Sequence, residues 1–588
     1  MIFDVRFPSF GSNQKKRTTV SAVKYWNLIV LLVLSAMFQL VGCISDEADE
    51  QGVLTSYQKA LSDQGPQQRA DTEGRDPLKP LGLLKPVPSP KAAIPDVEIV
   101  TDPNTGEKTV NLTIEQAIAR MLANSPEIRV VSFDPSIVKQ DITKAAAEFD
   151  VTAFGQVNYE EEDNPTNSIF QPGQSDVRIL ESGIRQKGIT GADWSVSYAL
   201  TRSWDDLVGR TLSTRYEPIL GFQLRQPLLR DAGLEVTLAG VNIARLNYKT
   251  ALLGFRQKAE DAATQVITAY WQLLQARRDS EVYEGLLERT LDTLNKVEGR
   301  REIDATDVQI KQTEAFAKAR EATLLQARKA VIDAQDTLVR LMADAQLNML
   351  DDFKIVPVSQ ASLQAEQLEP LKILGIAMRN NPVIQQARIG TEIAEINIRA
   401  AENQDMPRLD LIASARTQGL DKSPESAQDR LNGGDYISYA VGLSLEYPFG
   451  NRLRDAELLQ RKLERRKAIS TLQNVADQVA LLARESIRRI KTNLAEIQVQ
   501  AEAVDAAAIH LQAVEDSELI RQQLTPEFLL VKLQAQERLA QSESAQIRAT
   551  VDFNISLARL AQNMGTVLEL HQVRTSLPSI SDQNSASE

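Results

Sequence analysis

The chain has 588 residues, of which 43% are hydrophobic, 25% charged and 5% aromatic, and its formal net charge is −13. This apolar content excludes a wholly disordered protein. The acidic balance argues against a nucleic-acid partner, because phosphate binding needs a basic footprint. Histidines 510 and 571 and the single Cys43 leave almost no groups for metal binding or His-based catalysis. We therefore expect no metal, no cofactor and no enzymatic activity.

The first segment has the form of a bacterial export signal. Basic residues, among them Lys15 and Lys24, precede an apolar stretch at 28–41, which is too short for a membrane-spanning helix of about 20 residues. We interpret residues 1–42 as a signal peptide. Its end, Leu40-Val41-Gly42-Cys43, resembles the lipobox of bacterial lipoproteins, in which the cysteine is acylated and becomes the mature N-terminus. The alternative is an inert, buried cysteine.

The resemblance to lipoproteins also bears on sorting. An Asp after the cysteine favours retention in the inner membrane, whereas this chain has Ile44, which favours the outer membrane. Residues 43–102 are predicted to form a tether, because its second half is rich in proline and so favours extended, semi-rigid chain. Residues 568–588 are predicted to be a disordered tail.

One sequence pattern occurs twice, about 256 residues apart. A helical pattern from Leu112 leads into Asn124-Ser125-Pro126, and another from Leu371 leads into Asn380-Asn381-Pro382. Each copy continues with a helical pattern and then with alternating segments that close at Pro227 or Pro448. A very long helix, a polar turn and a shorter helix follow each proline. The order of elements is therefore predicted to be duplicated.

The two repeats have the following predicted bounds. The first repeat, 103–345, contains a helix, strands within 150–226, a long helix over 231–298, a tip at 299–305 and a helix over 306–343. A connector at 346–369 leads to the second repeat, 370–567, which contains a helix, strands within 408–447, a long helix over 451–522, a tip at 519–528 and a helix over 526–564. At about 1.5 Å per residue each long helix would measure roughly 100 Å, about twice each shorter one. Two short helices stacked end to end would match one long helix.

The strand segments alternate between apolar and polar residues. Between Tyr436 and Tyr447 every second residue is apolar, and the segments 194–200 and 220–225 repeat this pattern. The alternation is typical of membrane barrel strands of about 9 to 11 residues, although any single segment also suits a soluble sheet. With opening strands at 151–159 and 408–415, we expect about four principal strands and an inserted hairpin around 191–202. Because small barrels need about eight strands, the chain must share its barrel with other copies of itself.

Together these features resemble the TolC-type outer-membrane efflux channel family, over about residues 112–567. The resemblance is carried by the paired Asn-x-Pro helices and by four runs: Ala269-Tyr270-Trp271-Gln272-Leu273-Leu274, Gln226-Pro227-Leu228-Leu229, Tyr447-Pro448-Phe449-Gly450 and Thr306-Asp307-Val308-Gln309. It implies a mainly α fold with a membrane β-barrel portion. Three copies would each give four strands to a twelve-stranded barrel, and their helices would form a tunnel across the periplasm.

The resemblance further implies a function without chemistry. The chain would be the outer-membrane channel subunit of a tripartite efflux or type I secretion system, and its partners would be a periplasmic adaptor and an inner-membrane pump. Substrate would pass through a water-filled lumen whose width and charge set the selectivity.

The helix tips are implied to dock the adaptor. The candidate docking residues are Gly299, Arg300, Arg301, Glu302, Thr306 and Asp307 at the first tip and Thr525 and Pro526 at the second. Thr525 and Pro526 suit the cap and first position of a helix, but the second tip lacks the glycine usual in the family. Glu515, Asp516 and Glu518 are candidates for an acidic ring that constricts the lumen and attracts cations. The alternative for both sets is ordinary solvated charge.

Two other functions compete with the channel. A lipid-anchored coiled-coil scaffold would need the helices, but neither the amphipathic strands nor the duplicated order. An exported enzyme would need a nucleophile, a base and an orienting group, and the sequence has no GxxxxGK[ST], HExxH or strand-borne GxGxxG motif.

Overall fold

The structure is a computed structural model, and it describes residues 99–101, 108–168, 170–207, 209–344, 346–347, 353–361, 369–520 and 525–571. Two compact units divide these residues: a sheet unit that includes Phe149–Leu234 and Pro407–Tyr447, and a helical unit that includes Glu235–Met406 and the residues from Pro448 onward. The predicted signal peptide, Cys43 and most of the predicted tether lie outside the described residues. Among the described residues, none of the helices combines the length and the hydropathy needed to cross a membrane.

Each repeat begins with a helix that is interrupted at an X-Pro step. In the first repeat α3 (Ile114–Asn124) ends and α4 (Pro126–Ala146) begins around Ser125, and in the second α8 (Pro370–Asn380) and α9 (Pro382–Asp405) meet at Asn381. The prolines lack an N–H and push the preceding residue out of the helical region. The Asn381 side chain accepts hydrogen bonds from the backbone N–H groups of Val383 and Ile384 and so caps α9.

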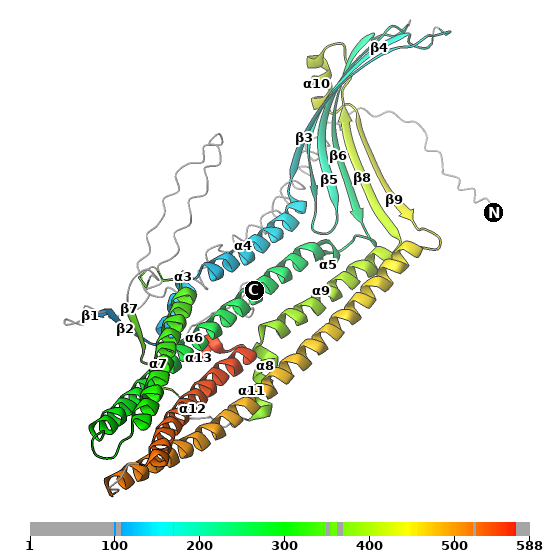
Figure 1. Cartoon of the computed structure of the whole chain (residues 1–588). Coiled ribbons are helices and arrows are strands. Elements are labelled where there is room, and N and C mark those ends of the chain that lie inside the picture. Colours follow the sequence, from blue (N-terminus) through cyan, green and yellow to red (C-terminus); the bar gives the residue numbers. More distant parts are fainter. Residues whose placement is uncertain are drawn as a thin grey trace. The chain divides into compact units, whose positions relative to one another are not determined.

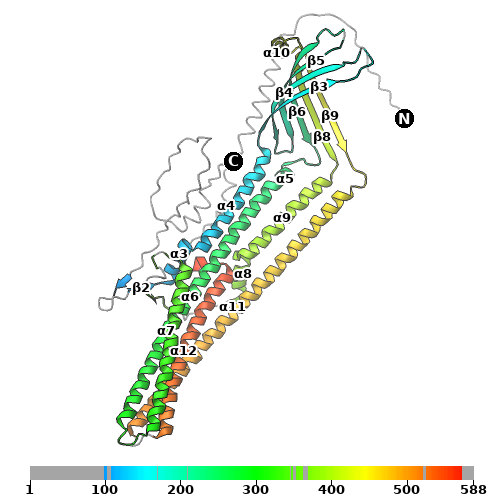
Figure 2. The same cartoon turned by 45° about the horizontal axis from the view of Figure 1, so that its top comes forward.

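Two long helices run through the helical unit beside four shorter ones. After the short α5 (Leu234–Thr237), α6 (Ala239–Gly299) has 61 residues and α11 (Arg452–Ile520) has 69, and α7 (Asp307–Met342) and α12 (Pro526–Met564) follow them. In one part of the unit the order is α4, α6, α9, α11, and in the other it is α7, α6, α12, α11 (Figures 1 and 2). Helices α9 and α12 therefore lie between the two long helices α6 and α11, and α4 and α7 lie on the other side of α6.

A small three-stranded sheet combines one strand from the predicted tether, one from the start of the predicted first repeat and one from the predicted connector. Its order is β1 (Ile99–Thr101), β2 (Lys108–Leu112) and β7 (Phe353–Pro357), with β2 and β7 parallel. The buried Tyr270 hydroxyl of α6 donates to the Leu112 carbonyl oxygen and accepts from the Ser359 N–H, each at 2.9 Å. These three strands were not predicted, because a short strand is defined by its pairing partner rather than by its own sequence.

The C-terminal boundary also differs from the prediction. Helix α12 ends at Gly565 in the left-handed conformation, and the short helix α13 (Val567–Leu570) begins at the last residue of the predicted repeat and extends into the predicted tail. Val567 and Leu568 are buried in the same core cluster as residues of α3 and α6. The packed chain therefore continues to the end of α13.

The sheet unit contains one antiparallel sheet of six strands in the order β3, β4, β5, β6, β8, β9. The strands are β3 (Thr152–Asp163), β4 (Gln174–Lys187), β5 (Asp193–Asp205), β6 (Thr214–Pro227), β8 (Arg408–Gln418) and β9 (Ile437–Glu446), and α10 (Pro424–Gly433) joins the last two (Figure 1). The edges of the sheet are β3 and β9.

The expected four principal strands and inserted hairpin agree with the six strands in number, but the hairpin is longer than the predicted segment 191–202. Only β5 was anticipated there, and its partner β4 pairs along its whole length with both β3 and β5. Strand β4 was not predicted from the sequence because apolar and polar residues alternate imperfectly along it. Asp176, Arg178 and Ser182 interrupt the apolar face, and Gly183 has no side chain.

Candidate functional site

The sheet has one apolar and one polar face, which the strand register defines. Across the middle of the sheet, Ile184 pairs with Val196, Val196 with Phe222, Phe222 with Ala415 and Ala415 with Tyr439. The neighbouring row on the other face contains Arg185, Ser195, Gln223, Ser414 and Ala440. Because side chains alternate along a strand, these two rows separate apolar from polar groups across the middle of the sheet.

The apolar face is open over much of its area. Val441, Leu443 and Leu445 of β9 are 73%, 67% and 70% exposed. At one end of the sheet α10 lies against this face, where the Tyr198 hydroxyl donates to Gln428 Oε1 at 2.7 Å. An exposed apolar face of this size marks a surface that contacts another protein or a membrane.

The first helix tip is an ordered turn. Arg300 donates from Nε and Nη2 to the two carboxylate oxygens of Asp304, at 2.8 and 2.6 Å. This ion pair raises the pKa of the Arg300 guanidinium. Thr306 and Gln309 form a capping box at the start of α7. Arg300 and Thr306 therefore hold the turn together.

Other candidate docking residues at this tip face solvent. Arg301 pairs with Asp307 at 2.9 Å, and both side chains are largely exposed. Glu302 is exposed, and so are the apolar side chains of Ile303 and Val308. The tip thus presents both charge and apolar surface.

At the second tip only the exit is described. The Thr525 side chain accepts from the Phe528 N–H, and Pro526 occupies the first turn of α12, as the sequence predicts. Of the candidate gate residues near the end of α11, Glu515 and Asp516 are exposed. Glu518 is instead paired with the Lys532 ammonium of α12, which is 2% exposed. Of the three candidate gate residues, Glu515 and Asp516 are therefore exposed to solvent, whereas Glu518 forms an ion pair.

A buried arginine that sequence analysis missed links three helices above the tips. Arg320 of α7 donates to the Leu533 carbonyl oxygen at 2.6 Å, to Gln536 Oε1 at 3.0 Å and to Thr290 Oγ1 of α6. Gln536 Nε2 in turn donates to Thr293 Oγ1 at 3.1 Å. Burial lowers the pKa of the Arg320 guanidinium, and the neighbouring Glu537 opposes this. An arginine in an Ala- and Gln-rich helix gives no sequence signal of burial.

A second buried ion pair lies where α6 meets the end of α12. Arg256 Nε donates to Glu260 Oε1 at 2.9 Å, and Arg256 Nη2 donates to the Gly565 carbonyl oxygen at 2.6 Å. Burial raises the pKa of Glu260 to about 7, whereas Arg256 lowers it. The pair stabilises the left-handed turn at Gly565, where a Cβ would approach the Asn380 carbonyl oxygen to 2.7 Å.

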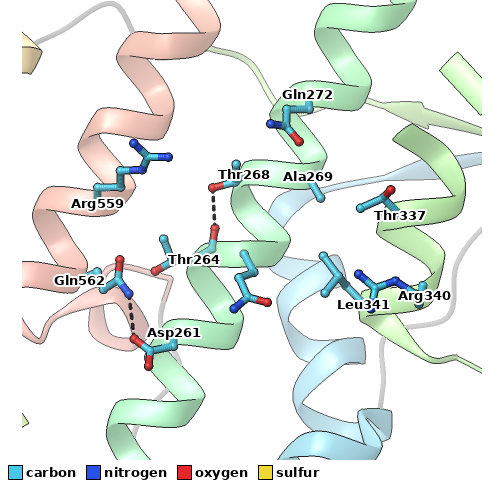
Figure 3. A pocket seen from close by; sticks show the side chains of 11 residues that line it. Asp261, Thr264, Thr268, Ala269, Gln272, Thr337, Arg340, Leu341, Arg559 and Gln562 are labelled. Atoms are coloured by element: carbon cyan, nitrogen blue, oxygen red, sulfur yellow. Dashed lines mark hydrogen bonds between the residues drawn. The ribbon is translucent and has the colours of Figure 1, made fainter. Parts of the chain in front are cut away.

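The helical unit also contains an open polar pocket between α6, α7 and α12, with an accessible volume of about 460 Å³ (Figure 3). Asp261 accepts from Gln562 Nε2 at 2.8 Å on its floor, and Arg340 and Arg559 come from opposite walls. In the described part of the chain, no group of His, Cys, Asp and Glu side chains could hold a metal ion. Because the lining of this pocket is mostly polar, we interpret it as a water-filled groove between the helices.

Residues 373–566 match the family model described as outer membrane efflux protein. No curated protein matches the sequence. Among solved structures, the outer-membrane channel OprN has a TM-score of 0.56 at 14% identity, over 77% of this chain and 90% of that one. The outer membrane protein VceC from Vibrio cholerae has a TM-score of 0.55 at 16% identity, over 77% and 96% of the two chains.

The outer membrane channel CmeC from Campylobacter jejuni has a TM-score of 0.55 at 11% identity, over 79% of this chain and 90% of that one. At such low identities these similarities concern the fold. The resemblance to outer-membrane efflux channels is confirmed by both comparisons. Residues 373–566 thus match the domain of the outer membrane efflux protein family, and the fold of the chain is similar to that of solved outer-membrane channels.

Proposed function

We propose that this chain is the channel subunit of a tripartite efflux or type I secretion system and conducts substrate passively across the outer membrane. The observation that supports this most directly is the six-stranded sheet with one apolar and one polar face. In a soluble protein, other helices or strands would pack against such an apolar face, because exposed apolar surface is unfavourable in water. Lipid would cover it in a membrane, and the polar face would line an aqueous lumen.

Closure of the sheet requires further copies of the chain. Strands β3 and β9 are the two edges, and an edge facing hydrocarbon leaves backbone groups unpaired at a cost of several kcal/mol each. Because the sheet is antiparallel and has an even number of strands, its two edges run in opposite directions. The β9 edge of one copy can therefore pair with the β3 edge of the next, and repetition closes a fully antiparallel wall.

The helical unit offers matching surfaces for the same assembly. Its outer helices are α4 and α7 on one side and α11 on the other. Val130, Phe133 and Ile137 of α4 are 66%, 58% and 62% exposed and lie at helical spacing on one face, and Leu459 and Leu463 of α11 are also exposed. We propose that these faces pack between copies of a homotrimer, whose helices then enclose a periplasmic tunnel.

The tips are the proposed contact with a periplasmic adaptor that is connected to an inner-membrane pump. Arg301, Glu302, Ile303 and Val308 form the solvent-facing part of the first tip, and Thr525 and Pro526 begin the helix at the second. Within the tunnel, Glu515 and Asp516 of three copies would concentrate cations. Cys43, outside the described residues, is the proposed site of acylation, which would anchor the assembly to the outer membrane.

Cross-linking combined with conductance tests the channel. Gln156→Cys in β3 is combined, one at a time, with cysteines at positions 438, 440, 442 and 444 of β9, which share the polar face with it. We expect one combination to give a covalent trimer in outer-membrane fractions, and the purified protein to form ion-conducting pores in planar bilayers. A protein that stays monomeric in detergent and conducts nothing would support the coiled-coil scaffold instead.

Acylation is tested separately. Cys43→Ser is expected to abolish incorporation of radioactive palmitate, and the heat-modifiable trimer should remain, because the sheet does not include this residue. Undiminished labelling of the Cys43→Ser protein would show that Cys43 is not the acylated residue.

A further inference from the structure

The sheet has a hairpin, β4 and β5, in addition to the four strands per copy that the sequence resemblance implies. We infer that this hairpin is part of the membrane-spanning wall, so that three copies build a barrel of eighteen strands from six strands each. The inference rests on the proposed function, because it assumes that the sheet spans the outer membrane. It concerns the width and the lining of the bore.

Strand order is the first argument. Strands β3 and β6 are consecutive members of a four-stranded arrangement, but here β4 and β5 separate them, and β3 pairs with β4 over its whole length, from Thr152↔Arg185 to Asp163↔Gln174. Strand β5 pairs with β6 from Asp193↔Arg225 to Trp204↔Thr214. The hairpin therefore cannot leave the wall without separating β3 from the rest of the sheet.

The inner turn of the hairpin reaches the end of the sheet where β3 begins and β6 ends. The turn runs from Gly188 to Ala192, and the Gly188 N–H donates to the Ala192 carbonyl oxygen at 2.6 Å. Gly191 has a φ of +88°, and a Cβ there would lie 2.2 Å from the Asp231 carbonyl oxygen. The turn is thus fitted against the chain that follows β6, so β4 and β5 extend as far as their neighbours.

In the half of the hairpin nearest its turn, residues 180–200, the faces continue those of the sheet, whereas Asp176, Arg178 and Arg202 lie on the apolar face in the other half. On the apolar face Leu180 pairs with Leu200 and Ile184 with Val196, and Leu180 and Ile184 are 51% and 40% exposed. On the polar face Glu181 and Arg185 alternate with them, and Ser195 and Ser197 follow in β5. A surface flap in water would have no need of an apolar face that continues that of the wall.

The packing on the polar face also fixes β4 between its neighbours. A Cβ at Gly183 would lie 2.8 Å from Phe154 Cζ of β3 and 2.4 Å from the Val196 carbonyl oxygen of β5. The Phe154 ring thus covers Gly183, and the Arg185 guanidinium lies 5.9 Å from the centre of that ring. An aromatic side chain placed over a strand glycine is a device that fixes strand register.

The consequence is a wider bore. Barrel diameter grows roughly linearly with strand number, so eighteen strands give a diameter about one and a half times that of twelve, in the range of porins with an aqueous channel. Each hairpin adds its own acidic, basic and hydroxyl side chains to the lining. The bore at this level is therefore suited to bulky, hydrated solutes rather than to close contact with one small molecule.

Site-directed spin labelling tests the hairpin and the proposed function in one experiment. Single cysteines are introduced into the full-length chain as three adjacent pairs: Leu180 and Glu181 in β4, Val196 and Ser197 in β5, and Leu443 and Ser444 in β9. The unsubstituted chain, which retains Cys43, supplies the background. Nitroxide labels in reconstituted trimers are then compared for collision with oxygen, which concentrates in lipid, and with a water-soluble nickel chelate.

We expect a several-fold higher ratio of oxygen to nickel accessibility at Leu180, Val196 and Leu443 than at their partners. If the β9 pair alternates in this way but both residues of the β4 and β5 pairs are accessible to nickel, the hairpin lies outside the membrane and the inference is overturned. If the β9 pair itself shows no lipid contact, the proposed function fails first. The two failures are therefore distinguishable.

A deletion provides the second measurement. Replacement of residues 164–213 by an Asn-Gly turn joins β3 directly to β6, which runs antiparallel to it. We expect the trimer of this variant to exclude polyethylene glycols, added from the sheet end, that enter the full-length pore. Entry of the same polymers into both proteins would contradict a wall that includes the hairpin.

Discussion

Arg320 of α7 donates from Nη2 to the carbonyl oxygen of Leu533 in α12 at 2.6 Å, although the two residues are 213 positions apart in the sequence. The guanidinium is almost completely buried and also contacts α6 through Thr290. A cation in this position needs all its hydrogen bonds, because a buried charge without partners is strongly unfavourable. One side chain therefore links α7 to both α6 and α12.

Arg320→Met should lower the free energy of unfolding of the helical unit by about 2 to 4 kcal/mol, because it leaves Gln536 and the Leu533 carbonyl oxygen without their donor. Thermal unfolding in detergent measures the effect. The matched control is Arg328→Met in the same helix, α7. It removes only an exposed ion pair with Glu284 of α6 and should cost less than about 1 kcal/mol. Equal losses in the two variants would contradict a special role for Arg320.

The second prediction concerns Glu260, whose pKa burial raises to about 7 from the ordinary 4.5. The folded chain binds this proton more tightly than the unfolded chain, so the contribution to stability is fully present below about pH 4.5 and is lost as the pH rises through about 7. The free energy of unfolding should fall across this range by about 3 kcal/mol relative to Glu260→Gln. Denaturant titrations of both proteins at several pH values measure the difference, and parallel pH profiles would contradict it.

The third prediction concerns Gly183 of β4. Gly183→Ala should displace β5, because the added Cβ would lie 2.9 Å from Ser197 Cα and even closer to the Val196 carbonyl oxygen. We expect a loss of about 1 to 3 kcal/mol and a smaller heat-modifiable trimer fraction in outer membranes. Gly221→Ala in the interior strand β6 is the control, since the nearest atom to its Cβ position is Ser197 Oγ at 3.7 Å, an ordinary contact distance. A normal trimer yield for Gly183→Ala would show that β4 is not closely packed in the sheet.

The fourth prediction separates order from docking at the first tip. Arg301→Ala combined with Glu302→Ala should reduce export in cells about tenfold, which corresponds to about 1.4 kcal/mol of adaptor binding, because both side chains face solvent. The melting temperature should not change. Arg300→Ala should instead loosen the turn, since Arg300 pairs with Asp304 through two hydrogen bonds. Normal export by the double variant would identify its two charges as solvated surface.

The long helices and their boundaries could be predicted closely from the sequence, because their signals are local. Helix α12 has the predicted bounds of Pro526 and Met564, and Thr525 caps it as expected. The strand at 437–446 was also anticipated, since its alternation has no interruption. In these segments propensity, pattern and capping all favour the same structure.

Features that depend on partners distant in sequence were missed. Strand β7 has only five residues and pairs with a segment about 245 residues earlier. Strand β4 has a broken alternation, and only its pairing with β3 and β5 identifies it as a strand. The Arg320 contacts were missed for a similar reason. An arginine on an amphipathic helix is usually solvated, and only the packing of α6, α7 and α12 buries this one.

The opposite directions of β3 and β9 have a consequence for how such channels can change over time. If one strand were added to each copy, its two edge strands would run in the same direction. Identical copies could then no longer pair their edges in antiparallel fashion. Acquisition of a whole hairpin preserves the joint between copies. The circumference can therefore grow by units of two strands per copy, while the surfaces through which neighbouring copies recognise each other remain unaltered.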